Sequence, residues 1–85
     1  LLGVVTNYFG KLEAAEILLQ SGDLNKGDDI LIIGPTTGVL ELNVTTLHGD
    51  NGETNIVKKG NLCAVAVSQK VRRNDKVYKL IDIAD

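Results

Sequence analysis

The feature that most constrains this chain is a series of short apolar runs separated by turn-forming residues. Clusters of Gly, Asn and Asp interrupt the apolar residues at intervals of roughly ten positions. Val, Ile and Thr are frequent in the runs, and β-branched residues favour strands. This spacing predicts an all-β fold, a small antiparallel β-barrel of about six or seven strands. The expected strands are residues 1–6, 14–19, 30–33, 39–47, 62–67 and 77–83.

Residues 11–20 are the segment that also fits a helix. Leu12, Ala15 and Leu19 would share one helical face, whereas Ala15, Ile17 and Leu19 alternate as they do in a strand. Because strands are expected on both sides of this segment, we expect a strand here as well.

Two of the expected strands, residues 30–33 and 63–67, are apolar on both faces. Such a strand can pack against the barrel interior on one face and against a partner domain on the other. A small barrel also exposes some Val and Ile without any partner, and this simpler interpretation stays open.

One turn pattern occurs three times along the chain. An apolar residue and two polar residues precede Gly or Asn, which tolerate positive φ, and then Asp or Asn, which can accept a backbone N–H. We also expect a β-hairpin tip at Asn51-Gly52, with positive φ at both residues, and a short loop around Pro35. The residues expected to build turns are Gly27, Asp28, Asn51, Gly52, Gly60, Asn74 and Asp75.

Candidate catalytic groups are few. A chain of 85 residues leaves little interior for a deep cleft, and His48 is its only histidine. The candidate nucleophiles Ser21, Ser68 and Cys63 have no local signature, and Cys63 lies in an apolar run where a buried, inert thiol is expected. One Cys and one His cannot complete a zinc site. We therefore expect no catalytic residue, no metal site and no cofactor in this domain.

The charges are divided unevenly along the chain. Residues 1–55 carry a net charge of −6, with two Lys against eight Asp and Glu, whereas residues 56–85 carry +4, with seven Lys and Arg against three Asp. A basic patch is the basis of sequence-independent nucleic-acid binding. Alternatively, these charges are solvated and keep strand edges from pairing. The hypothetical nucleic-acid or partner contacts are Lys58, Lys59, Lys70, Arg72, Arg73 and Lys76.

Aromatic residues add little to this hypothesis. Tyr8, Phe9 and Tyr78 are the only ones in the chain, so stacking on the bases of a single strand is not expected.

Several segments, taken in order, resemble one family. They are Val-Thr-Asn-Tyr at residues 5–8, Ala-Glu-Ile-Leu-Leu at 15–19, Ile-Gly-Pro-Thr-Thr-Gly at 33–38 and the basic region at 57–79. Together they resemble the C-terminal domain of the collagenase-like peptidases, family U32, whose barrel is similar to the second domain of elongation factor Tu. Asn61 and Asn74 depart from this pattern, which usually shows Asp and Gly there.

The resemblance implies that residues 1–85 form a single barrel domain, a C-terminal fragment of a larger protein. It implies that the parent protein is a peptidase or a factor that hydroxylates RNA, whereas this domain alone is no enzyme. The family's cysteine-rich signature belongs to the upstream catalytic domain, and nothing here matches it. The implied role is to help position a macromolecular substrate, protein or RNA, for that domain. The alternative is a module for structural packing or self-association with no substrate contact.

The sequence also predicts a cellular location. No run reaches the roughly 18 apolar residues that a membrane span needs, and a single cysteine suits a reducing compartment. The chain begins at Leu1 rather than Met, as a domain taken from a longer protein would. We expect a cytoplasmic protein without membrane contact.

Overall fold

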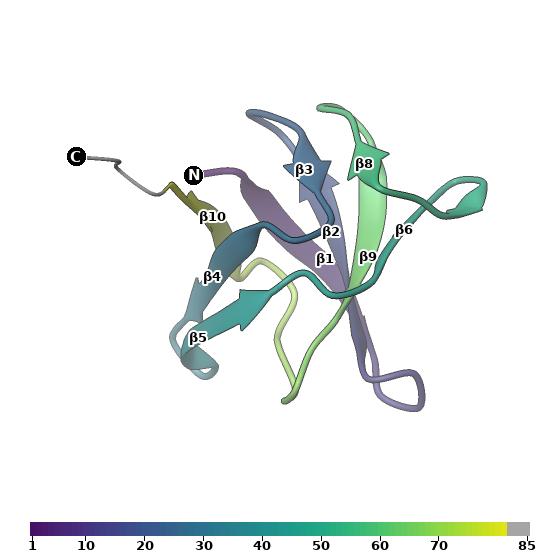
Figure 1. Ribbon diagram of the computed structural model, residues 1–85. Helices are drawn as coiled ribbons and strands as arrows, with labels where there is room; N and C mark the ends of the chain where they lie inside the picture. The colour runs from purple at the N-terminus through teal and green to yellow at the C-terminus, as the bar shows by residue number, and fades with distance from the viewer. Residues whose placement is uncertain (82–85) are drawn as a thin grey trace.

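Every regular element of the chain is a β-strand in the part that the structure describes, residues 1–81 of the computed structural model (Figure 1). The prediction of an all-β chain is confirmed. Residues 14–19 form a strand, as expected from their alternation. Of the last expected strand, residues 77–80 lie in a strand, and residues 82 and 83 lie outside the described residues.

Six strands have five residues or more. They are β1 (Gly3–Phe9), β2 (Ala14–Leu19), β4 (Asp29–Gly34), β5 (Gly38–Asn43), β9 (Leu62–Ala66) and β10 (Lys76–Leu80). The four short strands are β3 (Leu24–Asn25), β6 (Leu47–Gly49), β7 (Gly52–Glu53) and β8 (Ile56–Val57). The expected strand over residues 39–47 is divided, because β5 ends at Asn43 and β6 begins at Leu47. Strands of two or three residues are too short to show an alternating pattern.

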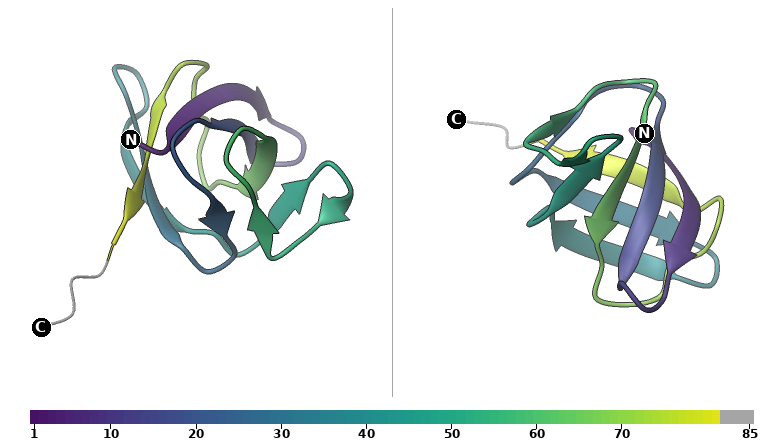
Figure 2. Two further views of the ribbon diagram at one scale, coloured as in Figure 1. Left: turned by 90° about the horizontal axis from the view of Figure 1, so that it is seen from above. Right: turned by 90° about the vertical axis from the view of Figure 1, so that its right-hand side faces the viewer.

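Eight strands form one antiparallel sheet in the order β5-β4-β10-β1-β2-β9-β6-β7, and β3 pairs with β8 in a second, two-stranded sheet. The large sheet curls around a common interior, as both views in Figure 2 show. Within residues 1–81 no strand pairing joins its outermost strands, β5 and β7. The sheet thus has two edges, one at each end of the curl.

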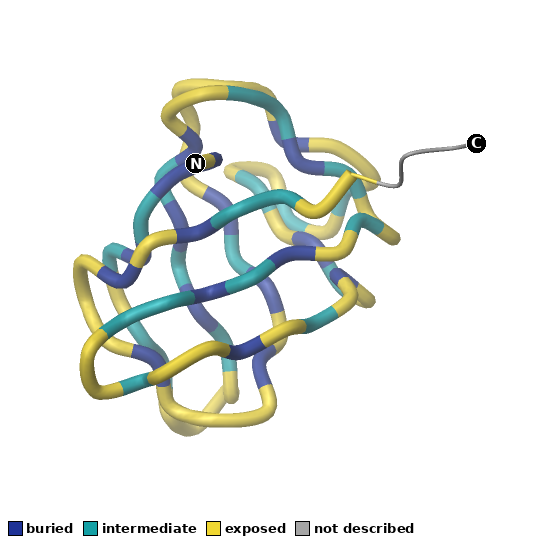
Figure 3. The backbone as a smooth tube through the Cα atoms, turned by 90° about the vertical axis from the view of Figure 1, so that its left-hand side faces the viewer, coloured by how far each residue is buried: buried dark blue, intermediate teal, exposed yellow. Residues whose placement is uncertain are grey.

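The inward side chains of the sheet make the hydrophobic core. In β2, Ala15, Ile17 and Leu19 are fully buried, and Figure 3 shows the same alternation along the other strands. Full burial of one Val, Leu or Ile stabilises the fold by about 1.5–3 kcal/mol. In β4, Ile30 and Ile32 point into this core, whereas Leu31 and Ile33 on the outer face are only half-buried.

The three similar turns share one backbone geometry. Gly27, Gly60 and Asn74 have φ values of 95°, 93° and 75°, as the third position of a type II turn requires. In two of the turns the next carboxylate accepts a backbone N–H from three residues earlier. Asp28 Oδ2 lies 2.8 Å from the nitrogen of Asn25, and Asp75 Oδ2 lies 2.9 Å from that of Arg72.

The β6–β7 hairpin turns one residue earlier than expected. Gly49 pairs with Gly52, so Asp50 and Asn51 form the two-residue loop. The expectation of positive φ at both Asn51 and Gly52 is wrong, because only Gly52 has it, at 101°. A glycine in this position after the loop is typical of hairpins that contain a bulge.

Candidate functional site

Three of the expected basic residues gather around one open surface hollow. Lys70, Arg72 and Arg73 come from the loop between β9 and β10, and Tyr8 comes from the end of β1. We call this the basic hollow, and its volume is about 500 Å³. Its lining residues are Asn7, Tyr8, Gly10, Lys70, Val71, Arg72 and Arg73.

The backbone of the β9–β10 loop is firmly anchored beneath these side chains. Val71 is buried in the core, and the Asn74 nitrogen donates to the carbonyl of Val5 at 2.8 Å. Arg73 Nε donates to the carbonyl of Thr6 at 3.0 Å. The anchored loop fixes the backbone positions from which the three cationic side chains extend into the solvent.

A β-bulge in β1 brings Tyr8 into the hollow. Val5 pairs with Ile17 and Asn7 pairs with Glu16, so Thr6 is the additional residue. The bulge reverses the alternation after Thr6, and Tyr8 therefore packs partly against the core while Asn7 is exposed. The sequence alone predicts no base stacking by Tyr8, because the number of aromatic residues does not show which of them the fold places beside a charge.

The cations of the basic hollow have no carboxylate partners among the described residues. The salt bridges in residues 1–81 involve Lys26, Lys58 and Lys79 instead. Lys70, Arg72 and Arg73 are all exposed. Exposed, unpaired Lys and Arg side chains can bind phosphate oxygens, and the planar guanidinium of Arg can do so through two bonds.

Lys58 and Lys59 lie at the opposite end of β9, in the turn between β8 and β9. The five residues of β9, at about 3.3 Å each, separate this turn from the basic hollow by roughly 13–17 Å of strand. The Nζ atom of Lys58 lies 3.5 Å from Asp23 Oδ2, and the backbone nitrogen of Lys59 donates a hydrogen bond to Asp23 Oδ1 at 2.7 Å. The structure therefore does not bring the expected cations together into one patch.

Lys76 also lies apart from the basic hollow. It is the first residue of β10, where it pairs with Val4 of β1 and Ile33 of β4, and its side chain is exposed.

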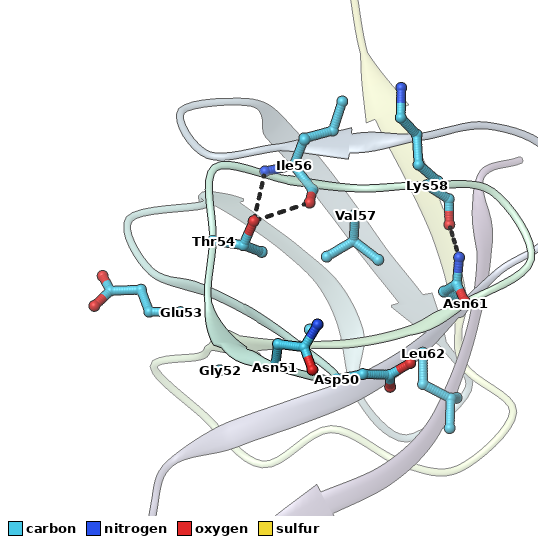
Figure 4. A pocket seen from close by; sticks show the side chains of 11 residues that line it. Asp50, Asn51, Gly52, Glu53, Thr54, Ile56, Val57, Lys58, Asn61 and Leu62 are labelled. Atoms are coloured by element: carbon cyan, nitrogen blue, oxygen red, sulfur yellow. Dashed lines mark hydrogen bonds between the residues drawn. The ribbon is translucent and has the colours of Figure 1, made fainter.

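A second hollow lies between the β6–β7 hairpin and the β8–β9 turn (Figure 4). Its volume is about 300 Å³, and its rim includes Asp50, Glu53 and Lys58. Thr54 Oγ1 donates a hydrogen bond to the carbonyl of Ile56 at 3.2 Å, which fixes the chain between β7 and β8 at this rim. No group of three or more His, Cys, Asp and Glu suited to a metal occurs in the described part of the chain. The charges here are mixed, so this hollow is less suited to an anion than the basic hollow.

The candidate catalytic side chains do not meet. His48 pairs with Ala64 and is exposed, whereas Cys63 on the same strand as Ala64 is buried in the core. The His48 side chain lies on the same face as that of its partner Ala64, and the next residue of that strand, Cys63, points to the opposite face. Within residues 1–81 no hydrogen bond joins His48 to Cys63. Burial, together with the nearby charge of Glu16, raises the pKa of Cys63 to about 12.

Solved structures share this fold. The C-terminal domain of a protein named a U32 peptidase, from Geobacillus thermoleovorans, superposes with a TM-score of 0.83 at 15% identity, covering 93% of this chain and 90% of that one. Its selenomethionine variant superposes with a TM-score of 0.80 at 14% identity, covering 88% of this chain and 93% of that one.

Curated proteins match the sequence as well. A collagenase of Porphyromonas gingivalis is 37% identical over 78 residues, which are 92% of this chain and 22% of the collagenase. The chain is therefore similar in fold to the C-terminal domain of a U32 peptidase and similar in sequence to a collagenase. An uncharacterized protease of Methanocaldococcus jannaschii is 42% identical to this U32-like domain over 79 residues, which are 93% of the chain and 19% of the protease.

The U32-like domain spans about a fifth of the length of the curated relatives that it matches. In these relatives the matched region is thus one part of a larger protein. No protein-family model matches the chain. The described part of the chain contains no helix with the length and hydrophobicity that a membrane span requires.

Proposed function

We propose that this U32-like domain is a non-catalytic accessory domain that binds RNA through the basic hollow and positions it for an upstream catalytic domain of the same cytoplasmic protein. The observation that carries the proposal is the grouping of Lys70, Arg72 and Arg73 beside Tyr8, without carboxylate partners in residues 1–81. Phosphate contacts from Lys and Arg account for most of the affinity of such binding.

Tyr8 supports an RNA ligand over a simple anion. An aromatic ring beside cations can stack on an unpaired base while the cations hold the neighbouring phosphates. The half-buried ring is supported by the core, and Asn7 Oδ1 accepts the backbone N–H of Tyr8 at 2.9 Å. Packing against the core restricts the motion of the ring before any ligand arrives, which lowers the entropic cost of binding.

The experiment is a titration of fluorescently labelled tRNA with the 85-residue chain at about 50 mM salt, followed by anisotropy. The double variant Lys70→Glu/Arg72→Glu reverses two charges at the basic hollow. The matched control, Lys58→Glu/Lys59→Glu, reverses two charges in the turn at the other end of β9. We expect the first variant to weaken binding at least tenfold and the control to weaken it less than threefold, since about 1.4 kcal/mol corresponds to a factor of ten. Absent binding, or equal loss in both variants, would overturn the proposal.

Structural packing against another domain is a second candidate function, favoured by a separate apolar hollow of about 400 Å³. Phe9 and Leu12 line this hollow together with Ala14, Ala64 and Ala66, and Leu12 is 75% exposed. The substitution Leu12→Ser distinguishes the two functions, because it should leave tRNA binding unchanged while weakening any association with the remaining part of the parent protein.

A further inference from the structure

The two edges of the eight-stranded sheet differ in a way that matters for binding. One edge strand, β7, has only two residues, Gly52–Glu53, and natural proteins commonly protect an edge by keeping it this short. The other edge strand, β5, has six residues and pairs with β4 from Gly38 to Asn43 without a bulge. Strand β5 also contains neither Pro nor Lys, which are common protecting residues at edges.

The outer side of β5 has free backbone groups. In an antiparallel edge strand, alternate residues direct their N–H and C=O groups away from the neighbouring strand. Within residues 1–81, no backbone group of residues 39–43 forms a hydrogen bond outside the β4–β5 pair. A further extended strand could therefore pair along this side.

The outward side chains of β5 combine an apolar residue with a negative charge. Val39 is 68% exposed and lies beside Ile33 of β4, and the exposed Glu41 lies beside Leu31 of β4. Most residues of β5 are exposed, and Figure 3 is viewed from the side of the molecule on which β4 and β5 lie. The exposed cation Lys76 pairs with Ile33 from the far side of β4, so it is two strands away from the free edge.

We propose that β5 accepts an extended segment of a partner protein as an additional strand, and that the segment carries Lys or Arg opposite Glu41 and an apolar residue opposite Val39. These two partner residues are two positions apart, because residues i and i+2 of a strand share a face. The backbone pairing would supply affinity, and the two side-chain contacts would supply specificity. This site is separate from the basic hollow and does not depend on RNA binding.

A second copy of this chain is a poorer occupant for the same edge. Two copies of β5 can pair in two antiparallel registers that keep the outward side chains on one face and retain most of the backbone hydrogen bonds. In one register the two Glu41 side chains lie directly opposite each other, and in the other they are diagonal neighbours. Their Cβ atoms would then be about 4.5–8 Å apart, and like charges at this distance are destabilising. Charge complementarity therefore favours a basic segment.

The test uses the 85-residue chain labelled with ¹⁵N and three six-residue peptides. The first peptide alternates Thr and Val, with one central Lys in place of a Val, so that a Val lies two positions from the Lys. The second peptide has Glu instead of this Lys. The third is the Lys peptide with every second backbone nitrogen methylated. We expect the Lys peptide to shift the amide signals of residues 38–43 and to bind about fivefold more tightly than the Glu peptide, as a cross-strand charge pair would produce. The methylated peptide should not bind, because it cannot complete the ladder.

The variant Glu41→Lys should reverse the preference between the Lys and Glu peptides. The matched variant Glu53→Lys makes the same charge change on the short edge strand and should leave the preference as it was. Both residues are exposed, so both variants should fold. Signal shifts away from β5, equal binding of the two peptides by the unaltered chain, or pairing of two copies through β5 without peptide would each overturn the proposal.

Discussion

Gly34 and Asp75 lie so close together that a Cβ atom on Gly34 would overlap with Oδ1 of Asp75. Asp75 is 3% exposed, and its other oxygen accepts hydrogen bonds from Thr37 Oγ1 and from the backbone nitrogen of Arg72. The absence of a side chain at Gly34 thus lets one carboxylate join the β4–β5 hairpin to the loop that carries the basic hollow.

The substitution Gly34→Ala should destabilise the fold by about 1–3 kcal/mol, because the added methyl group must displace a buried carboxylate. Urea unfolding at pH 7 measures this change. The control is Gly10→Ala, where the added atom would be 3.6 Å from the ring of Tyr8, an ordinary contact. If the two variants lost the same stability, the close approach of Gly34 to Asp75 would be contradicted.

Removing the carboxylate should also be costly. We expect Asp75→Ala to lower the free energy of unfolding by about 2–3 kcal/mol, because it removes two hydrogen bonds to a charged, buried acceptor. Asp75→Asn should cost about half as much, since the amide oxygen can still accept from Arg72 and Thr37. Chemical unfolding of both variants provides the comparison. A loss below about 0.5 kcal/mol in Asp75→Ala would show that this carboxylate does not hold the two segments together.

Much of the fold could be predicted from local patterns. The alternation of buried and exposed residue types correctly predicts the strand over residues 14–19. The Gly-Asp and Asn-Asp pairs predict turns, and Gly27 and Asn74 in these turns have positive φ. The division of residues 39–47 and the position of the β6–β7 loop could not be predicted. The division depends on which strands pair, because Leu47 pairs with Val65 of β9 whereas the residues of β5 pair with β4. The position of the loop depends on the register of β6 with β7, in which Gly49 pairs with Gly52.

The thiol of Cys63 should be unreactive in the folded protein. Its pKa is raised from 9.0 to about 12, so the thiol stays neutral in the native state while the unfolded chain ionises above about pH 9. Stability from this group is therefore fully present below pH 9 and is lost between pH 9 and 12. The difference in unfolding free energy between the unaltered chain and Cys63→Ala, measured at pH 7 and pH 10.5, should shrink at the higher pH. A constant difference, or rapid alkylation of the native protein at pH 8, would contradict this.

The carboxylate of Asp23 should titrate below its ordinary range. The backbone N–H of Lys59 and, to a smaller extent, the charge of Lys58 lower the pKa of Asp23 from 3.8. Because the folded-state pKa is lowered, the stabilisation is present above pH 3.8 and is lost as the pH falls through the folded-state value. A carboxyl titration followed by NMR should give a midpoint below 3.8, which Lys58→Gln should raise only in part. A midpoint at or above 3.8 would mean that the β8–β9 turn does not hold this carboxylate.

The candidate site could be predicted only in part. The uneven charge along the chain predicts Lys70, Arg72 and Arg73 as contact residues. It does not show that the length of β9 separates these three residues from Lys58 and Lys59. The place of Tyr8 in the basic hollow could not be predicted, because it results from the bulge at Thr6, which depends on how β1 pairs with β2. Residue type shows which groups can bind phosphate, whereas strand pairing decides which of them lie together.

The salt dependence of tRNA affinity tests the central claim most directly. Three phosphate contacts should give a plot of log affinity against log salt concentration with a slope of about −2 to −3, since each contact contributes roughly −0.7 to −0.9. The triple variant Lys70→Gln/Arg72→Gln/Arg73→Gln should flatten this slope almost to zero, whereas Lys58→Gln/Lys59→Gln should leave it unchanged. A slope that the triple variant does not alter would contradict RNA binding by the basic hollow.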